Sequence, residues 1–336
     1  MTRFGFYWVA VGIALHGCDA VETSTSTTIQ PGINMQGINM QGINMQGINM
    51  QGMAMHGFRV DGATMNGAVL SNVHVERGEV FADRGANTLH GTSLVGAHFL
   101  AEVRDASTTP PTVSSAEYRV TAIAPEDSQF DPTNTGNTFL YTLEQWVDST
   151  AGWQPACLPD ASGQNLAIPL AATWDENGNR SVSSALFTFG CTSGVIAKCY
   201  RWGYRPWVTG YGDLVSMHWT CTRVARADYC GNGVSHTHDG TAINVWDRLP
   251  APGPIQSHGG LLPPMGMMFE AGWNTGGAVC LSHARWLLDD GALLAAACPD
   301  RLVAPGLLGG TVCDMVSDVL GYDPNAKMFN EAYLNH

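Results

Sequence analysis

The chain has 336 residues, of which 45% are hydrophobic and 13% are charged, a composition typical of a folded protein long enough for two domains. Its formal net charge is -13, and neither sign forms a long run. We therefore expect no nucleic acid partner, because phosphate backbones select basic surfaces.

The N-terminal segment predicts export. One cation precedes an apolar stretch over residues 4–15, which is too short to cross a bilayer and suits the core of a secretion signal. The following Leu-His-Gly-Cys at 15–18 resembles the lipobox of bacterial lipoproteins, although His16 stands where a small residue is usual. That resemblance implies a signal peptide over 1–17 and a lipid on Cys18, which would anchor the protein in the bacterial cell envelope. A plain signal peptide with an unrelated cysteine is the alternative.

A Ser/Thr-rich tether over 18–31 leads into a glycine repeat. Eight glycines recur every five residues, and four identical Ile-Asn-Met-Gln-Gly pentads stand between the first five of them. A period of five fits neither a helix nor a strand and indicates a solenoid. The glycines are Gly32, Gly37, Gly42, Gly47, Gly52, Gly57, Gly62 and Gly67.

The repeat resembles the pentapeptide-repeat family, which implies a short right-handed β-solenoid over residues 32–100. In such a solenoid Met35 would lie over Met55, and Met45 over Met65. The isoleucines of the identical pentads are larger than the residues usual there, and overfilling costs roughly 1 to 3 kcal/mol per site. A partly ordered stalk is therefore the alternative. Methionines in these columns are better explained by packing than by copper binding, so we expect no cofactor.

A Ser-Thr-Thr-Pro-Pro segment marks a linker over 101–112, after which a second domain would occupy 113–336. Alternating apolar residues around Tyr118 and Tyr141 predict strands. Two apolar segments on either side of the Asn-Gly pair at 177–178 predict a hairpin.

Two helices are expected further along. Apolar residues share one helical face over 214–225 and another over 312–319, the second ending before Gly321 and Pro324. Since predicted strands come first and predicted helices follow, the C-terminal domain is expected to be a disulfide-stapled α+β domain.

The nine cysteines are divided unevenly, because all except Cys18 lie between residues 157 and 313. An even number of cysteines in one region of an exported chain predicts disulfides. A zinc site is the alternative, but the Cys-x-x-Cys spacing that would favour it does not occur. Closeness in sequence favours Cys191 with Cys199 and Cys221 with Cys230. The expected half-cystines are Cys157, Cys191, Cys199, Cys221, Cys230, Cys280, Cys298 and Cys313.

Three blocks of the C-terminal domain carry a family resemblance. They occupy 189–207, 226–241 and 278–286, and the second contains the tetrapeptide Ala-Asp-Tyr-Cys at 227–230. Together they are similar to the ADYC-domain family, which occurs in exported bacterial proteins. The resemblance names the domain over 113–336 and implies no particular activity.

The block around the tetrapeptide holds the candidates for catalysis. Cys230 with His236 or His238 and Asp239 has the residue types of a thiol nucleophile, its base and an orienting group, unless Cys230 is oxidised to a half-cystine. Alternatively, the two histidines bind zinc with Asp239 or His258. A lone His-x-His is a weak signal, so surface or core histidines are the default and we assign no metal.

Charged and aromatic residues near these blocks have two interpretations. Asp228 follows Arg223 and Arg226 and is expected to form a buried ion pair, because charges near a disulfide core must be paired. A nearby aromatic cluster suits stacking on a sugar or clamping a peptide, with core packing as the stronger alternative. Its members are Trp202, Tyr204, Trp207 and Tyr211.

The sequence thus predicts a lipid-anchored envelope protein, either periplasmic or at the cell surface. Its C-terminal domain would be a binding or structural module displayed on a short repeat pedestal, with an envelope glycan or protein as partner. The alternative is an extracytoplasmic hydrolase with a Cys/His or His-metal site in 228–239. No dinucleotide fingerprint, phosphate loop, Gly-x-Ser-x-Gly or His-Glu-x-x-His motif occurs, so an enzyme is the less favoured reading.

Overall fold

The structure is a computed structural model. It describes residues 54–105, 110, 112–126, 138–238, 241–250, 253–258, 266–286, 294, 296–298 and 313–334, and the backbone of 33–35. The chain divides into Met1–Gln30 and Pro31–His336, and every described residue belongs to the second unit. The expected lipid site, the tether and the pentads over 36–53 lie outside the described residues.

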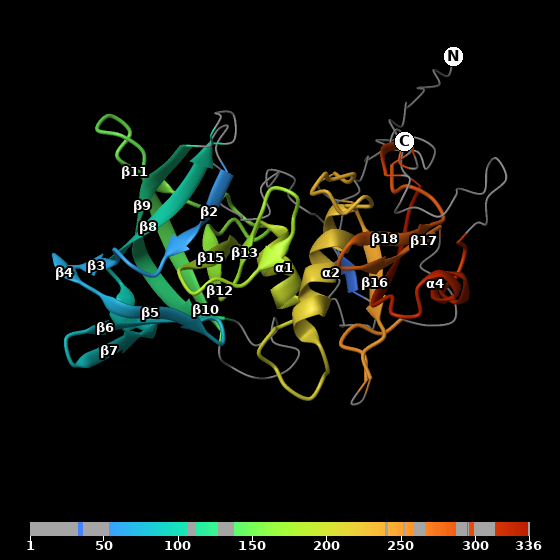
Figure 1. Cartoon of the computed structure of the whole chain (residues 1–336), viewed down its shortest axis with the longest axis horizontal. Helices are drawn as coiled ribbons and strands as arrows, with labels where there is room; N and C mark the ends of the chain where they lie inside the picture. The colour runs from blue at the N-terminus through green and yellow to red at the C-terminus, as the bar shows by residue number, and fades with distance from the viewer. Residues whose placement is uncertain are drawn as a thin grey trace, which may run out of the picture. The chain divides into compact units, whose positions relative to one another are not determined.

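Six antiparallel strands close into a barrel, drawn from blue to green in Figure 1. Each strand pairs with the next around the barrel, and the circle closes because β9 pairs with both β8 and β10. The strands in order are β10 (Phe139–Trp146), β12 (Leu166–Leu170), β15 (Leu186–Cys191), β2 (Ala54–Arg59), β8 (Ala97–Asp105) and β9 (Thr112–Pro125).

Aromatic side chains fill the barrel. Tyr118 and Phe189 are fully buried, and the ring of Phe58 lies 5.0 and 4.9 Å from theirs, centroid to centroid. A bulge in the β9–β10 pair moves the inward positions of β9 from Val120 to Ile123, which interrupts the simple alternation of the sequence. The interior of so narrow a barrel is a packed core, so a ligand would have to bind outside it.

Shorter strands extend and cover the barrel. β3 and β4 form a hairpin beside β8, and β11 pairs with β10. A three-stranded sheet, β5 to β7, contributes Val80 to the barrel core, where its N–H donates to the Tyr141 hydroxyl at 2.9 Å. The bounds are β3 (Thr64–Met65), β4 (Ala68–Val69), β5 (Ser71–Glu76), β6 (Glu79–Arg84), β7 (Asn87–His90), the 3-10 helix η1 (Gly91–Leu94) and β11 (Trp153–Pro155).

The expected right-handed β-solenoid over 32–100 is wrong. Antiparallel strands occupy its described part: β1 (Ile33–Met35) pairs with β16 (Ile243–Asp247), and β2 pairs with β8 and β15. The glycine spacing has another cause, since Gly62 and Gly67 adopt φ values of 81° and 75°, which glycine tolerates. Gly62 lies in a bend between β2 and β3, which pair one after the other with β8, and Gly67 lies in the turn between β3 and β4. These two glycines mark a bend and a chain reversal and do not mark the corners of stacked coils.

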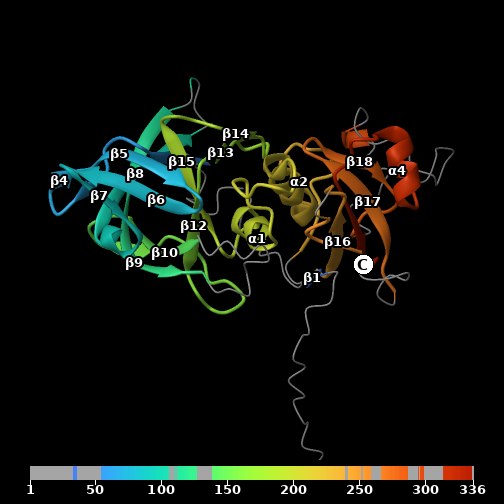
Figure 2. The same cartoon turned by 90° about the horizontal axis from the view of Figure 1, so that it is seen from below.

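Three described α-helices and a second sheet form the C-terminal lobe, which we define as residues 195–334. The helix α1 (Val195–Arg201) contacts β15 and α2 (Leu214–Arg226), and α2 in turn contacts the five-stranded sheet β1-β16-β19-β17-β18 (Figure 2). One hydrophobic core includes Ile168 of the barrel wall together with residues of α1, α2 and this sheet, so the lobe is packed directly on the barrel. The remaining bounds are β17 (Met268–Asn274), β18 (Gly277–Leu281), α4 (Val316–Tyr322) and β19 (Met328–Ala332).

The helix predicted over 214–225 is confirmed as α2. Asp213 caps its first turn by accepting a hydrogen bond from the Ser216 N–H at 3.0 Å. The face that periodicity placed inward is buried, including Met217 and Val224.

The second predicted helix is present as α4, but it begins at Val316, four residues later than predicted, and continues through Gly321. Val319 of the predicted apolar face is buried, whereas Met315 lies just before the helix and is 56% exposed.

The predicted α+β class is nevertheless wrong, because strand dominates the described residues, which contain only three α-helices. The sequence pattern conceals several of these strands. Every residue of β16 and β19 is buried, so neither strand shows the alternation that marks a sheet with one wet face.

The hairpin predicted around 177–178 is confirmed. β12 pairs with β15, and closer to the turn β13 (Thr173–Trp174) pairs with β14 (Arg180–Ser181). Gly178 takes a φ of 72° in the turn. Residues 101–112, expected as a linker, include the last residues of β8 and the first of β9, which pair as far as Asp105 and Thr112.

Four disulfides join the eight cysteines, which confirms the predicted framework. The two pairings favoured by closeness in sequence are wrong. Cys199 of α1 and Cys221 of α2 face each other, because the two helices pack together. Cys191, at the end of β15, is bonded to Cys157, and Cys230, in the turn after α2, is bonded to Cys298. The bonds are Cys157–Cys191, Cys199–Cys221, Cys230–Cys298 and Cys280–Cys313.

Four disulfides indicate an oxidising, extracytoplasmic environment. Among the helices of the described residues, none combines the length and the apolar character that a membrane crossing requires.

Candidate functional site

The tetrapeptide at 227–230 directly follows α2 and reverses the chain. Ala227 caps the helix in the left-handed conformation, with φ 50° and ψ 43°, and its N–H donates to the carbonyls of Arg223 and Val224. This conformation costs a non-glycine residue roughly 1 to 2 kcal/mol. The contacts of the next three residues therefore have to hold the turn in place.

Asp228 is fully buried and organises the loop that follows. Its carboxylate pairs with Arg223 and accepts hydrogen bonds from the N–H groups of Asn232 and Gly233, each at 3.0 Å. The ion pair expected between Asp228 and Arg223 is confirmed. With its charge and acceptor capacity already used inside the protein, Asp228 has the environment of a structural carboxylate.

Arg223 connects this loop to two distant turns. Its guanidinium donates to the Asn177 carbonyl at 2.6 Å and to the Asn179 side chain at 3.0 Å, both in the β13–β14 turn. It also donates to the Thr275 carbonyl at 3.1 Å, in the turn between β17 and β18. One buried arginine thus connects α2 with a turn of each neighbouring sheet.

Tyr229 begins a second buried network. Its hydroxyl donates to Glu270 at 3.0 Å and accepts from the Arg285 N–H at 2.9 Å, while its ring stacks on Trp273 with centroids 5.3 Å apart. Burial raises the pKa of Tyr229, so the phenol stays protonated and acts as a fixed donor. We call Arg223, Asp228, Tyr229, Glu270 and Arg285 the polar node.

Glu270 and Arg285 form a fully buried ion pair at the centre of this network. Two guanidinium nitrogens of Arg285 donate to the two carboxylate oxygens at 2.9 and 3.0 Å, and Asn330 donates to Glu270 at 2.8 Å. Arg285 further donates to Thr237 at 3.1 Å. Glu270 and Arg285 are both fully buried, paired and hydrogen-bonded. They therefore stabilise the packing of the lobe and are not accessible to a substrate.

Close backbone contact completes the node. The Ala278 N–H donates to the Tyr229 carbonyl at 2.9 Å. A Cβ added to Gly277 would lie 2.6 Å from the same carbonyl oxygen, and Gly277 has a φ of 114°. Only glycine allows β18 to approach the tetrapeptide this closely.

The proposed thiol nucleophile is bonded to another sulfur. Cys230 forms a disulfide with Cys298, so it has no thiolate with which to attack a substrate. The His236 ring packs on Tyr229 at 5.7 Å, while the exposed His238 lies edge-on to Trp286 at 4.2 Å. Asp239, the proposed orienting group, lies outside the described residues.

The alternative zinc set is also divided. His258 lies against Trp246, with ring centroids 4.5 Å apart, and its Nε2 is 3.1 Å from a carboxylate oxygen of Glu331. Over the residues for which side chains are described, no three His, Cys, Asp or Glu side chains converge as a metal site would require.

The aromatic cluster expected as a ligand face belongs largely to the core. Trp202 and Tyr204 are buried, and the Tyr204 hydroxyl donates to the buried Asp247 at 3.0 Å. Burial raises the pKa of both Tyr204 and Asp247. Trp207 and Tyr211 are half-buried against the same core, so these four rings do not form an open face.

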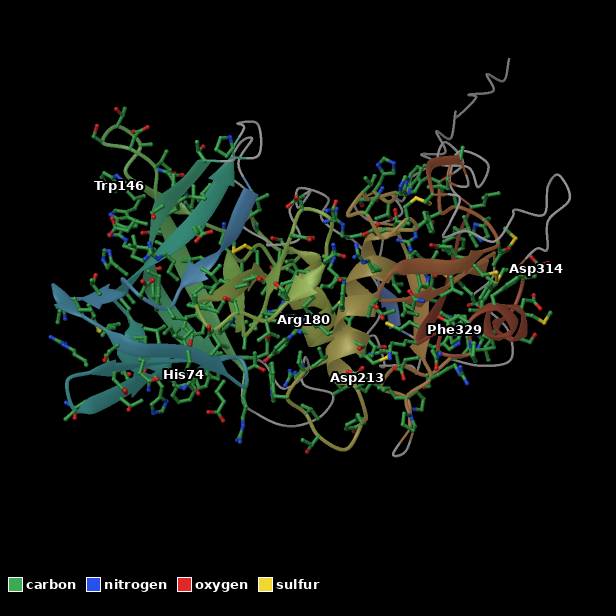
Figure 3. All side chains as sticks on the ribbon, in the orientation of Figure 1. His74, Trp146, Arg180, Asp213, Asp314 and Phe329 are labelled. Carbon is green, nitrogen blue, oxygen red and sulfur yellow. A yellow bond between two sulfur atoms is a disulfide. The ribbon has the colours of Figure 1, made fainter. Side chains whose placement is uncertain are left out.

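An open aromatic surface lies instead on the outside of the barrel, where no site was predicted. Trp146, labelled in Figure 3 at the end of β10, is 41% exposed and stands directly opposite the half-buried Trp153 of β11. Their rings are 5.5 Å apart and inclined at 66°. The two indoles therefore form an angled pair on rigid, hydrogen-bonded strands.

Charged side chains surround this pair. The guanidinium of Arg119 lies 4.5 Å from the centre of the Trp153 ring and also bonds Glu144, while His98 approaches the same ring edge-on at 5.4 Å. The Nδ1 of His98 is 2.7 Å from a carboxylate oxygen of Glu117. The barrel-face patch, as we call it, consists of His98, Glu117, Arg119, Glu144, Trp146 and Trp153.

Comparison with protein families gives one match, to the family described as the ADYC domain, over residues 91–287. That range covers more than half of the chain and contains the tetrapeptide whose buried contacts are described above. The chain belongs to the ADYC-domain family. No curated protein and no solved structure matches the chain.

The ADYC match includes both the polar node and the barrel-face patch. It begins at residue 91, before the expected domain start at 113, and ends at 287. Five of the six barrel strands lie within it, from β8 to β15. The ADYC domain is thus not separable from the barrel, because the barrel wall is part of its sequence.

The sequence contained a signal for the patch. Glu117 and Arg119 alternate with the buried Tyr118 and Val120, which places them on the outer face of a strand. Trp146 and Trp153 flank a turn, so a hairpin would bring them opposite each other. What the sequence does not show is that β8, β9, β10 and β11 are neighbours in one sheet.

Proposed function

We propose that this ADYC-domain protein is an extracytoplasmic binding protein of the cell envelope, held at a membrane by a lipid on Cys18. Four disulfides support the compartment, and the lipobox-like sequence at 15–18 supports the anchor. The barrel-face patch is its contact surface.

This proposal rests on the difference in burial between the family tetrapeptide and the barrel-face patch. The tetrapeptide at 227–230 is buried, and its Asp228 and Tyr229 bond to other buried residues, so it builds the fold. Trp146 and Trp153, in contrast, stand on the outer side of the barrel wall, and exposed tryptophan beside arginine is typical of binding surfaces. Strands hold such side chains more rigidly than loops do, which lowers the entropic cost of binding.

The hydrolase alternative has less support. Its thiol form requires a free Cys230, and that sulfur is bonded to Cys298. Its metal form requires His236, His238 and a third ligand, and the ring contacts of both histidines are with aromatic residues.

Site-specific photo-crosslinking in the native host tests the proposal. A photoreactive amino acid at position 146 should give adducts with an envelope component, recovered in the membrane fraction. Position 322 is the matched control, because Tyr322 is also exposed, at 36%, but lies on α4 in the C-terminal lobe. Equal labelling at both positions, or a protein found only in the cytoplasm, would refute it.

A further inference from the structure

We propose that the barrel-face patch binds the uncharged pyranose rings of an oligosaccharide. This inference rests on the proposed binding function and adds the chemical class of the ligand. It is argued from the two indoles, from the free acceptors beside them and from the sign of the surrounding charge.

The indole pair provides the apolar contact. A pyranose ring has faces made of C–H groups, which pack well on the electron-rich face of an aromatic ring. The ring planes of Trp146 and Trp153 are inclined at 66°, and 41% of Trp146 is exposed. A sugar ring can therefore stack on one indole while the second indole contacts its side. Arg119 lies over the Trp153 ring at 4.5 Å and Glu144 bonds Arg119, which fixes the orientation of that ring before a ligand arrives.

The carboxylates provide acceptors for hydroxyl groups. Glu144 uses its Oε2 toward Arg119, and Glu117 uses its Oε1 toward His98. In the described surroundings the second oxygen of each carboxylate remains free for a donor, and both side chains are partly exposed, at 28% and 44%. Sugar hydroxyls are donors of the right kind, because an ionised carboxylate can only accept.

The local charge excludes anionic ligands. The two carboxylates of the patch outnumber its one guanidinium, and the whole chain has a net charge of -13. Phosphorylated or acidic glycans would be repelled. Insertion into a bilayer would strip water from Glu117 and Glu144, which is costly for charged groups.

The same charges disfavour a protein partner. The core of a protein interface is depleted in glutamate, whereas here two glutamates, Glu117 and Glu144, lie beside the two rings. Angled aromatic rings bordered by acceptors fit a small, hydroxyl-rich ring better than a broad apolar surface.

The experiment measures binding of the exported, disulfide-intact protein to an array of neutral and anionic oligosaccharides, followed by calorimetry on the hits. We expect binding to at least one neutral oligosaccharide. Trp146→Ala should weaken that binding by at least about tenfold, as expected for an aromatic anchor. Trp146→Phe should retain part of the affinity, and Tyr322→Ala on α4 should leave it unchanged. Near-UV circular dichroism checks that each variant is folded.

Several results would overturn the inference: no neutral oligosaccharide bound, binding only to anionic glycans or to phospholipid vesicles, or neutral binding that Trp146→Ala leaves unchanged. Photo-adducts at position 146 with a protein, in the absence of sugar binding, would keep the proposed binding function and refute the sugar ligand. A third outcome separates the two proposals in the other direction. If Trp146→Ala abolishes sugar binding but positions 146 and 322 are labelled equally in cells, the sugar ligand stands and the proposed envelope role is refuted.

Discussion

Replacing Glu270 by Gln tests whether the polar node holds the C-terminal lobe together. The substitution keeps the shape of the side chain and removes the charge that faces Arg285, and both side chains are 0% exposed. Removing one partner leaves the other charge buried and uncompensated, so we expect the free energy of unfolding to fall by about 3 to 5 kcal/mol. The total free energy of unfolding of a folded protein is only roughly 5 to 15 kcal/mol. Urea unfolding with the disulfides intact should therefore show this loss clearly.

Two further variants make this result interpretable. Glu76→Gln removes an exposed carboxylate, 56% accessible and paired with Arg77, and should cost less than about 1 kcal/mol. Glu270→Leu combined with Arg285→Met removes both charges and should destabilise less than Glu270→Gln alone. Two results would refute this expectation: a loss of under about 1 kcal/mol in the free energy of unfolding for Glu270→Gln, or a double variant less stable than Glu270→Gln. Either would show that Glu270 and Arg285 do not need each other's charge.

Three other changes have expected outcomes. Cys18→Ser should move the protein from the membrane fraction to the soluble fraction, and membrane retention would contradict the lipid anchor. Burial lowers the pKa of His218 from 6.5 to about 4, while its ring bonds the Ile196 carbonyl at 2.9 Å. The unfolded state therefore binds the extra proton between these values, and stability should fall by about 3 kcal/mol as the pH is lowered from 6.5 to 4. His218→Gln should lose this part of the pH dependence in urea titrations, and an unchanged slope would speak against a neutral buried ring. Replacing both Cys199 and Cys221 by Ala opens a loop of sequence separation 22 and should cost about 3 kcal/mol, visible as a lower melting temperature under non-reducing conditions. An unchanged melting temperature would show that this bond does not constrain the unfolded chain.

The elements that sequence predicted well depend on local chemistry. The helix α2 has an N-cap aspartate and a continuous apolar face, and the β13–β14 hairpin has an Asn-Gly turn. Such signals act over a few residues, so they survive whatever the tertiary arrangement.

The elements that sequence misjudged depend on long-range pairing. β2 lies between β8 and β15, whose residues are more than forty and more than one hundred positions away, and nothing in its own pattern identifies these partners. Glycine spacing alone suggested stacked coils, whereas Gly62 lies in a bend between two strands that both pair with β8 and Gly67 lies in a hairpin turn. A local period constrains where a chain turns, but it does not state which strands then pair.

The functional candidates follow the same division. The family tetrapeptide was recognisable in sequence, and its Asp228–Arg223 ion pair was predicted from adjacent charges. The barrel-face patch was not predicted, because its residues come from four strands whose pairing in one sheet is decided by the tertiary structure.

Sequence was enough to establish that the chain belongs to the ADYC-domain family, that its eight C-terminal cysteines form disulfides and that its environment is oxidising, since composition and short motifs carry this information. The pairing of those cysteines, the closed barrel and the burial of Tyr229 against Glu270 and Trp273 required the folded chain. These features depend on contacts between residues far apart in sequence, and such contacts leave no periodic trace along the chain.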